Sequence, residues 1–322
     1  MGHADLNLRR RLDVVIGGLA VVDVIGRPVS MKAPPKTGGL QHLDSVTLTT
    51  GGNVLNCGLD LAKLGFRVGA IARIGHDAFG EYIMGRLRRH RVETSGITID
   101  RRLQTASTMV LVDRTGERTF LHARGCLRNF RPRDILDRLS ILRSARIFAF
   151  GYLGLLPECE PTLGELFRVI KKKAGVRILL DTGGNPRRDV QLLQEILPSV
   201  DYFIPSLEEA VSLTGEKTPA RIVKAFVKAG AGGVVGVKLG SRGCYVACEG
   251  REAIVPPVRV KRVVDSTGAG DAFVSGFLAG TLRGFDPFAA AEIGNAVAAS
   301  CVTAVGASTA IGPLETYLRR MN

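Results

Sequence analysis

The chain has no tryptophan and only five tyrosines among its 322 residues. Proteins that bind nucleic acid often stack bases on aromatic side chains or carry a known recognition motif. Neither a zinc-finger nor a homeodomain pattern occurs here. Acidic residues are also few, 30 against 44 lysines and arginines, which gives a formal net charge of +14. Because the basic residues are dispersed, we predict no nucleic-acid partner and a positive surface suited to small anionic ligands.

Cysteine is scarce and irregularly spaced, and the sequence contains no paired C-x-x-C spacing. This argues against a disulfide scaffold and against a structural metal site. We interpret the cysteines as free thiols and place the protein in the reducing cytoplasm. The six residues are Cys57, Cys126, Cys159, Cys244, Cys248 and Cys301.

Long uninterrupted apolar runs are missing as well. The stretch from Ala289 to Ala307 is broken by Glu292, Gly294 and Asn295, which predicts a buried helix rather than a membrane span. The start, Met1 to Arg11, lacks the apolar core of a secretory signal. We therefore expect a soluble protein without a membrane partner.

The composition that is present suits a folded α/β protein. Hydrophobic residues make up 45% of the chain and charged residues 23%, and mean hydropathy is slightly positive at +0.15. A chain of this length can bury a large core as one α/β domain with a small appendage.

Short apolar strands alternate with helical segments along most of the chain. A first strand runs from Asp13 to Gly18, and further strands are expected at Ala145 to Phe150, Arg177 to Asp181 and Tyr202 to Ile204. A helix from Thr162 to Lys173 separates two of them. This alternation predicts a doubly wound, mostly parallel sheet with right-handed crossovers and a cleft at its strand ends.

Glycines at the end of the first strand raise the possibility of a dinucleotide-binding unit. That motif requires G-x-G-x-x-G, but position 20 is Ala20 and position 22 is Val22, so the pattern is incomplete. Two other segments, 26–50 and 96–125, are interpreted as exposed strands, including Ile97 to Ile99. Prolines and glycines break the first segment, and a turn at Asp113 to Gly116 divides the second. They predict a separate small sheet or a set of surface hairpins.

The stretch from Val258 to Leu282 carries the strongest signal for chemistry. A β-branched run to Val264 predicts a strand, the glycines around Ala269 predict a turn, and apolar spacing from Ala272 predicts a helix. The amides of Gly268, Ala269 and Gly270 would then be free at a helix start, which favours an anion such as phosphate. Asp271 could accept a proton from an attacking hydroxyl, although a glycine turn with Asp271 as helix cap would give the same letters.

Two segments resemble the signatures of the ribokinase (PfkB) family of carbohydrate and nucleoside kinases. Asp265 to Asp271 is similar to the second signature of that family, and Gly51 to Asn56, followed by a helix that closes in Leu64-Gly65, is similar to the first. Both occur in the expected order, and the resemblance extends from Leu12 to Leu318.

The resemblance implies a ribokinase-like α/β fold with a β-sheet lid that covers the sugar. On this basis residues 1–25, 51–95 and 126–322 form the nucleotide- and substrate-binding core, and residues 26–50 and 96–125 form the lid. In several relatives the lid also makes the dimer contact, so a homodimer through the lid is expected. Closing the lid would exclude water from phosphoryl transfer.

The resemblance also implies which residues bind the sugar. Asp23 matches the carboxylate that holds sugar hydroxyls, the amides of Gly51 and Gly52 would approach the sugar, and Asn56 would hydrogen-bond it. Asn53 departs from the pattern, because ribokinase has lysine there, and the departure leaves the identity of the sugar open.

On the nucleotide side, the resemblance implies contacts to ATP from five positions. Glu209 matches a glutamate that positions Mg²⁺ through water, although Ser206 replaces the asparagine that accompanies it in relatives. An ordinary helix cap is an equal interpretation of that pair. Carbonyl groups around Asp265 bind a monovalent cation such as K⁺ in many relatives. The expected ATP contacts are Lys238, Gly240, Gly243, Thr267 and Asn295.

The implied reaction is transfer of the γ-phosphoryl group of Mg-ATP to a sugar hydroxyl. Asp271 is expected to act as general base, and the amides of Gly268, Ala269 and Gly270 as the anion hole. A nucleoside kinase and a sugar-sensing protein without turnover remain alternatives. An already phosphorylated acceptor is also possible if lid arginines meet its phosphate, the candidates being Arg101, Arg102, Arg118 and Arg124.

Overall fold

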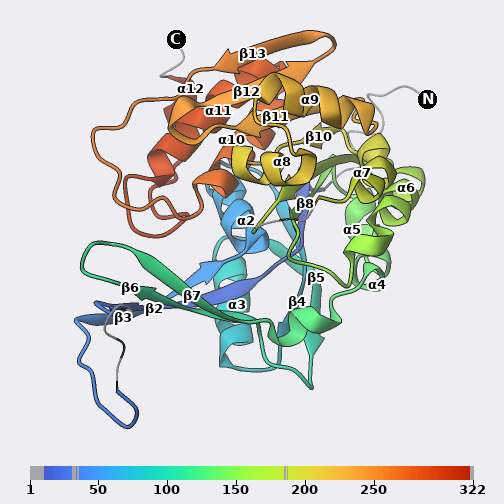
Figure 1. The fold of residues 1–322 in the computed structure, drawn as a ribbon. Helices are drawn as coiled ribbons and strands as arrows, with labels where there is room; N and C mark the ends of the chain where they lie inside the picture. The colour runs from blue at the N-terminus through green and yellow to red at the C-terminus, as the bar shows by residue number, and fades with distance from the viewer. Residues whose placement is uncertain (1–10, 31–33, 35, 185, 187, 320–322) are drawn as a thin grey trace.

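The computed structural model describes residues 11–30, 34, 36–184, 186 and 188–319, and Met1 to Arg10 lie outside the described part. The described chain forms two separate sheets (Figure 1). The larger has nine strands in the order β13-β12-β11-β10-β9-β8-β1-β4-β5, parallel from β11 to β5 with antiparallel β12 and β13 at one edge. Its strands are β1 (Val14–Gly17), β4 (Val68–Gly75), β5 (Glu93–Asp100), β8 (Ile147–Leu153), β9 (Arg177–Thr182), β10 (Tyr202–Phe203), β11 (Val234–Lys238), β12 (Cys244–Cys248) and β13 (Arg251–Val255).

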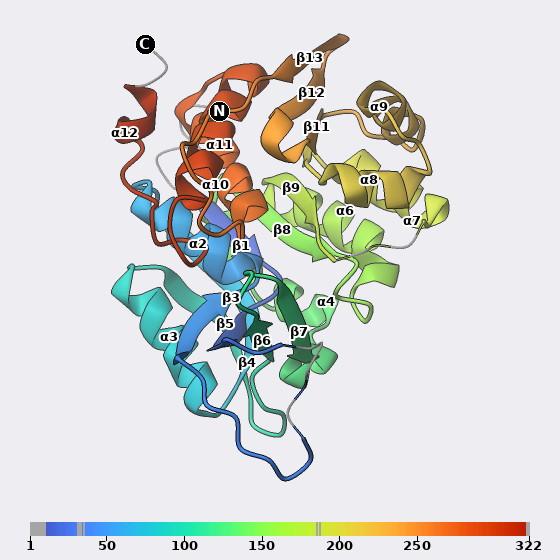
Figure 2. The ribbon, with the colours of Figure 1, turned by 60° about the vertical axis from the view of Figure 1, so that its left-hand side comes forward.

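Helices cover both faces of this sheet (Figure 2). One face carries α2 (Asn53–Lys63), α3 (Ala78–Arg89), α10 (Ala269–Arg283) and α11 (Pro287–Cys301), with α12 (Glu315–Leu318) near the end of the described chain. The other carries α4 (Pro132–Leu136), α5 (Leu139–Arg143), α6 (Leu163–Ala174), α7 (Val190–Ile196), α8 (Leu207–Thr214) and α9 (Pro219–Lys228). The doubly wound, mostly parallel sheet expected from the sequence is thereby confirmed.

The central strand β1 shows why the apolar runs have no alternation. Val15 packs into the core beneath α4 to α9, whereas Val14 and Ile16 pack into the core beneath α2 and α10. All three are at most 1% exposed, as expected for a strand covered on both faces.

The lid is a four-stranded sheet that projects from the body, in the order β3-β2-β6-β7 (Figure 1). Its strands are β2 (Val21–Arg27), β3 (Ser45–Gly51), β6 (Ser107–Val112) and β7 (Arg118–Ala123). Alternate residues face opposite sides. Asp23, Thr108 and His122 are register partners on one side, and Val24, Met109 and Leu121 are register partners on the other.

Three expectations about strands need correction. Ile97 to Ile99 belongs to β5 and pairs with β4 in the large sheet, so that strand is not part of the lid. Val21 to Ile25 lies in β2, which pairs with β3 and β6, so the lid begins before residue 26. The chain from Val258 to Val264 forms no strand: Pro256 and Pro257 lack the amide donors that would continue a ladder.

Two further expectations from the sequence concern free cysteines and membrane-spanning helices. All six cysteines are free, and five of them are buried, while Cys248 is partly exposed. Among the described helices, none combines the length and the apolar character needed to cross a bilayer.

Candidate active site

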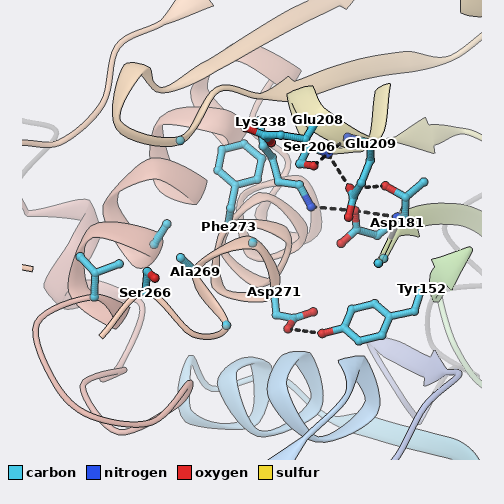
Figure 3. Close-up of a pocket in the computed structure, with 18 of the residues that line it drawn as sticks. Tyr152, Asp181, Ser206, Glu208, Glu209, Lys238, Ser266, Ala269, Asp271 and Phe273 are labelled. Carbon is cyan, nitrogen blue, oxygen red and sulfur yellow. Dashed lines mark hydrogen bonds and ion pairs between the residues drawn. The ribbon is translucent and has the colours of Figure 1, made fainter. Parts of the chain in front are cut away.

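One large cavity lies between the lid and the carboxyl ends of the parallel strands. Its volume is about 1430 Å³, which exceeds the roughly 300–1,000 Å³ of a typical ligand pocket and leaves room for two ligands end to end. Lid residues Asp23, Thr108 and His122 line one end, and Gly240 and Asn295 line the other. The start of α10 lies between these two ends, with Asp271 in the wall (Figure 3).

The turn before α10 is shaped by a glycine that no other residue could replace without displacement. Gly268 caps the helix with a left-handed φ of 76°, and a Cβ at this position would lie 2.3 Å from the Cβ of Ala307. Within the described chain the amides of Gly268 and Gly270 have no hydrogen-bond partner, whereas the amide of Ala269 donates to the carbonyl of Ser266 at 3.2 Å. Two of the three expected anion-hole amides are therefore available, and the third is used inside the turn.

Asp271 is buried in the cavity wall and held by two donors. Its Oδ2 accepts a hydrogen bond of 2.8 Å from the side-chain amide of Asn56. It accepts another of 2.8 Å from the hydroxyl of Tyr152 (Figure 3). Burial raises the pKa of Asp271 above its ordinary value, and the hydrogen bonds from Asn56 and Tyr152 oppose that rise. A carboxyl group tuned in this way is suited to general-base chemistry.

Lys238 brings a positive charge to the same place. Its ammonium group lies 2.7 Å from Oδ1 of Asp181 at the end of β9, and a Cβ built on Gly270 would lie only 3.4 Å from that ammonium. Burial by itself lowers the pKa of Lys238, but the carboxylates of Asp181 and Glu209 outweigh burial and raise it. The ammonium therefore stays charged beside the free amides of the turn, where it favours an anion.

The lid end of the cavity presents hydrogen-bonding groups in a row. Thr108 Oγ1 lies 3.0 Å from Nδ1 of His122, and Asp23 is the neighbour of Thr108 in β2. Burial raises the pKa of Asp23, and a hydrogen bond from Thr108 opposes the rise. Such a row can hold several hydroxyl groups of one small ligand.

Gly51 and Gly52 allow close backbone contacts, and Gly51 lies directly against Asp23. A Cβ on Gly51 would lie 2.4 Å from Oδ2 of Asp23, so the carboxylate rests directly on that backbone. Gly52 has φ of 80°, and a Cβ there would meet the carbonyl oxygen of Leu19 at 2.5 Å. Gly52 lines the cavity, while Gly51 acts through Asp23.

The two asparagines of the same segment have different positions from those expected. Asn56 lies behind Asp271 and donates to it, instead of lining the cavity among the described residues. Asn53, 3% exposed, accepts a hydrogen bond from the amide of Leu19 and donates one to the carbonyl of Gly17, each 2.9 Å long. Asn53 therefore fixes the β1–β2 connection and has no direct contact with the cavity.

Glu209 serves as a cap and also lines the cavity. Its Oε2 accepts from the amide of Ser206 at 2.8 Å, and Ser206 Oγ accepts from the amide of Glu209 at 3.3 Å, which forms a capping box. The hydroxyl of Thr182 donates to the same carboxylate. In the described chain no three His, Cys, Asp or Glu side chains cluster closely enough to hold a metal ion.

The end of the cavity opposite the lid is built largely from turns. Gly243, with φ of 88°, lies so close to β13 that a Cβ would meet the carbonyl of Val255 at 2.1 Å. Asn295 donates to that carbonyl at 3.2 Å and to the carbonyl of Pro256 at 2.8 Å. Gly240, Gly243 and Asn295 all line the cavity, and Asn295 fixes the chain at its edge.

Asp265 and Thr267 lie beneath the turn, outside the described residues that line the cavity. The carboxylate of Asp265 accepts from the amide of Thr267 at 2.8 Å and from the amide of Gly306 at 3.0 Å. It also forms an ion pair with Arg118 of the lid. Both residues therefore support, from outside the cavity, the turn before α10 that carries the free amides of Gly268 and Gly270.

Sequence reasoning missed Tyr152 and the partners of the lid arginines. Tyr152 lies in β8, beyond Phe150, where the sequence predicts this strand to end, and nothing in the sequence indicates that its side chain faces Asp271. Arg118 pairs with Asp265, and Arg124 pairs with Glu158, so β7 is fastened at both ends to two different loops of the core. Of the four arginine candidates, Arg124 alone lines the cavity.

Comparisons with known proteins agree with this geometry. A family model described as pfkB family carbohydrate kinase matches residues 11–313. The 2-dehydro-3-deoxygluconokinase of Bacillus subtilis is 28% identical over 295 residues, which is 87% of this chain and 89% of that protein. The structure of Arabidopsis thaliana ribokinase complexed with ribose and ATP has a TM-score of 0.82 at 25% identity, covering 96% of this chain and 98% of that one. A structure from E. coli, described as a ribokinase II in complex with ATP and Mg²⁺, has a TM-score of 0.80 at 23% identity and covers 96% and 99%.

Proposed function

Since the chain belongs to the pfkB family of carbohydrate kinases, we propose that it transfers the γ-phosphoryl group of ATP to a hydroxyl of an unphosphorylated monosaccharide, with Asp271 as general base. One observation carries this proposal. The buried carboxylate of Asp271 shares a single cavity with the free amides of Gly268 and Gly270 on one side and with Asp23 on the other.

The chemistry follows from what each group can hold. The acceptor hydroxyl gives its proton to Asp271 as its oxygen attacks the γ-phosphorus, and the bond from that phosphorus to the β-phosphate oxygen breaks, releasing ADP. The amides of Gly268 and Gly270, together with the Lys238 ammonium, stabilise the charge on the phosphoryl oxygens. A general base contributes about 10²- to 10⁴-fold, and positioning supplies much of the remainder.

Mg²⁺ fits this site as an ion held largely by water and phosphate. Glu209 and Asp181 are carboxylates at the cavity wall, and both are already hydrogen-bonded to protein groups. Mg²⁺ prefers such sites, because it keeps several waters and takes one or two carboxylates plus substrate phosphates. When bound, it would neutralise charge on the ATP phosphates. The related E. coli protein, solved with ATP and Mg²⁺, supports this assignment.

The lid end of the cavity favours an acceptor without a phosphate. Arg118 is paired with Asp265 and Arg124 with Glu158, while Arg101 and Arg102 lie outside the lining. Arg118 and Arg124 are therefore both paired with carboxylates of the core. Asp23, Thr108 and His122 instead offer hydrogen bonds suited to hydroxyl groups.

The proposal is tested by coupled ADP release with a panel of acceptors. Ribose and 2-dehydro-3-deoxygluconate come first, because related proteins are named for these sugars or hold them. Fructose 6-phosphate and adenosine test the phosphorylated and nucleoside alternatives. Turnover of an unphosphorylated sugar supports the proposal, whereas ligand binding without ADP release for every acceptor contradicts it and points to a sensing protein.

Three carbonyl groups near the expected monovalent-cation position accept from protein donors, whereas the carbonyl of Asp265 has no donor among the described residues. The thiol of Cys301 lies 3.4 Å from the carbonyl of Thr267 and 3.0 Å from that of Ala307, and the Lys63 ammonium donates to the carbonyl of Ser308. Because protein donors already contact the carbonyls of Thr267, Ala307 and Ser308, we propose that turnover does not require K⁺. Equal rates in potassium and tetramethylammonium buffers of the same ionic strength would support this, and loss of activity without potassium would refute it.

The outer face of the lid supports a homodimer. Leu48, Val24, Met109 and Leu121 are successive register partners across all four strands, and Leu48, Met109 and Leu121 are 40%, 54% and 50% exposed. An apolar row of this kind marks an interaction surface. We propose that two copies pair through it in the reducing cytoplasm, which the free thiols also favour. Light scattering of Met109→Glu against the unaltered chain tests the pairing, and a monomeric unaltered chain would exclude it.

A further inference from the structure

The phenol of Tyr152 contacts the general base, and no step described above uses it. We propose that Tyr152 is a positioning residue for Asp271: with Asn56 it holds Oδ2, so that Oδ1 is the oxygen that takes the proton from the acceptor hydroxyl. This inference rests on the proposed function, because it assigns the oxygen of the proposed base that reacts.

The two carboxylate oxygens of Asp271 have different hydrogen-bond partners. Oδ2 accepts from Tyr152 and from Asn56, each at 2.8 Å, and a carboxylate oxygen has about two lone-pair positions. Oδ1 has only the thiol of Cys57 at 3.6 Å among the described residues. Oδ1 therefore keeps the capacity to accept the substrate proton.

The backbone and packing at Tyr152 show that the fold imposes the position of its phenol beside Asp271. Tyr152 has φ of 70°, the left-handed region that a bulky side chain rarely adopts and that persists only where the surroundings impose it. The register of β8 shifts between Phe150 and Leu153, next to this residue. Gly183 provides the space, because a Cβ there would lie 2.8 Å from the tyrosine ring. A glycine on the neighbouring strand end thus makes room for the ring that reaches Asp271.

The groups around Asp271 determine the direction in which its pKa changes when the hydrogen bond from Tyr152 is lost. Asn56 and Cys57 face it from α2, with Asp60 one turn further along; Asp181 faces it from β9 and Lys238 from β11. Burial raises the pKa of Tyr152, and the charge on Asp271 raises it further, so the phenol stays protonated and donates. A hydrogen bond to the charged carboxylate lowers the pKa of Asp271, and its loss must raise that pKa.

The Tyr152→Phe variant tests the proposal by its pH profile. The variant keeps the ring and removes one donor to a carboxylate, so the acid limb of kcat/KM should move up by about one pH unit, a tenfold effect. KM for ATP should stay as in the unaltered enzyme. The acceptor is the sugar that gives the highest turnover in the panel. Tyr245→Phe is the matched control, because Tyr245 donates to Glu252 on the exposed edge of the large sheet.

A second measurement needs no turnover. Carboxyl ¹³C resonances of aspartate-labelled protein give the pKa of Asp271 once Asp271→Asn has identified its signal. We expect that pKa to rise in Tyr152→Phe and to stay constant in Tyr245→Phe. An unchanged pKa, or an acid limb that coincides with that of the unaltered enzyme, would overturn the assignment of Tyr152. If no sugar is turned over, the proposed function fails, while the resonance still decides whether Tyr152 sets the state of Asp271.

Discussion

The side-chain amide of Asn56 donates a 2.8 Å hydrogen bond to the carboxylate of Asp271, although 215 positions separate the two residues in the chain. Asn56 lies in the first turn of α2 and Asp271 in the first turn of α10, and the two helices share one face of the large sheet. The two signatures of the family thus meet in one hydrogen bond. Under the proposed mechanism, the first signature orients the base that the second supplies.

Replacing Asn56 by alanine should reduce the fraction of Asp271 that is ionised at acid pH without removing the base. Loss of a buried hydrogen bond to a charged group costs about 1.5 kcal/mol, or roughly tenfold in kcat at the acid end of the profile. The acid limb should move to higher pH, since the amide lowers the pKa of Asp271. A pH profile of sugar-dependent ADP release checks this, and an altered KM for sugar with an unmoved acid limb would instead show that Asn56 binds the sugar directly.

Gly51→Ala should raise KM for the sugar about tenfold while ATP binding stays the same. The added Cβ would meet Asp23 Oδ2 at 2.4 Å and push the carboxylate from its place, an overpacking cost of about 1–3 kcal/mol. Gly58→Ala on α2 is the matched control, because nothing in the described chain lies within 4 Å of its Cβ. If both variants keep the normal KM, Asp23 does not contact the sugar.

Arg118→Ala should increase ATP hydrolysis that occurs without sugar. The Arg118–Asp265 ion pair joins the lid to the loop that braces the anion turn, and its loss lets water enter while the turn loses support. We expect the ratio of sugar-dependent to sugar-independent ADP release to fall about tenfold, as for a hydrogen-bonded charge pair. Arg114→Ala, in the exposed lid hairpin, should leave the ratio unchanged. Equal ratios in both variants would show that the ion pair is incidental.

Asp100→Asn should reduce stability at neutral pH and make the protein less sensitive to acid. Burial raises the pKa of Asp100, but hydrogen bonds from Asn129 and from the amides of Arg102 and Leu103, with the charge of Arg73, hold it at about 2. A lowered pKa adds stability above the unfolded value of 3.8 that is lost as pH falls from 3.8 through about 2. Urea unfolding at pH 7 should show a loss of about 1–2 kcal/mol. A variant as stable as the unaltered chain at pH 7, with the same acid transition, would contradict this.

The sequence was informative where backbone conformation depends on residue type. Gly268 adopts the left-handed conformation that its turn requires, and β1 packs on both faces as its apolar run indicated. The β-branched run at Val258 failed as a strand predictor, because side-chain preference cannot supply the amides that Pro256 and Pro257 lack.

Side-chain partners could not be read in the same way. Tyr152 reaches Asp271 through a strained backbone, and Arg118 meets Asp265 across 147 positions, so neither pair has a local sequence signal. The prediction that Ile97 to Ile99 belongs to the lid is wrong for a related reason. Its alternation fits either sheet, and only the pairing with β4 decides between them.

The central claim is that Asp271 removes the proton from the acceptor hydroxyl, and Asp271→Asn tests it most directly. The measurement compares sugar-dependent ADP release with ATP binding, the latter by titration calorimetry, in the variant and the unaltered enzyme. We predict that ATP binding is retained and that sugar-dependent release falls at least about 10²-fold. Release within a few-fold of the unaltered rate would contradict the account.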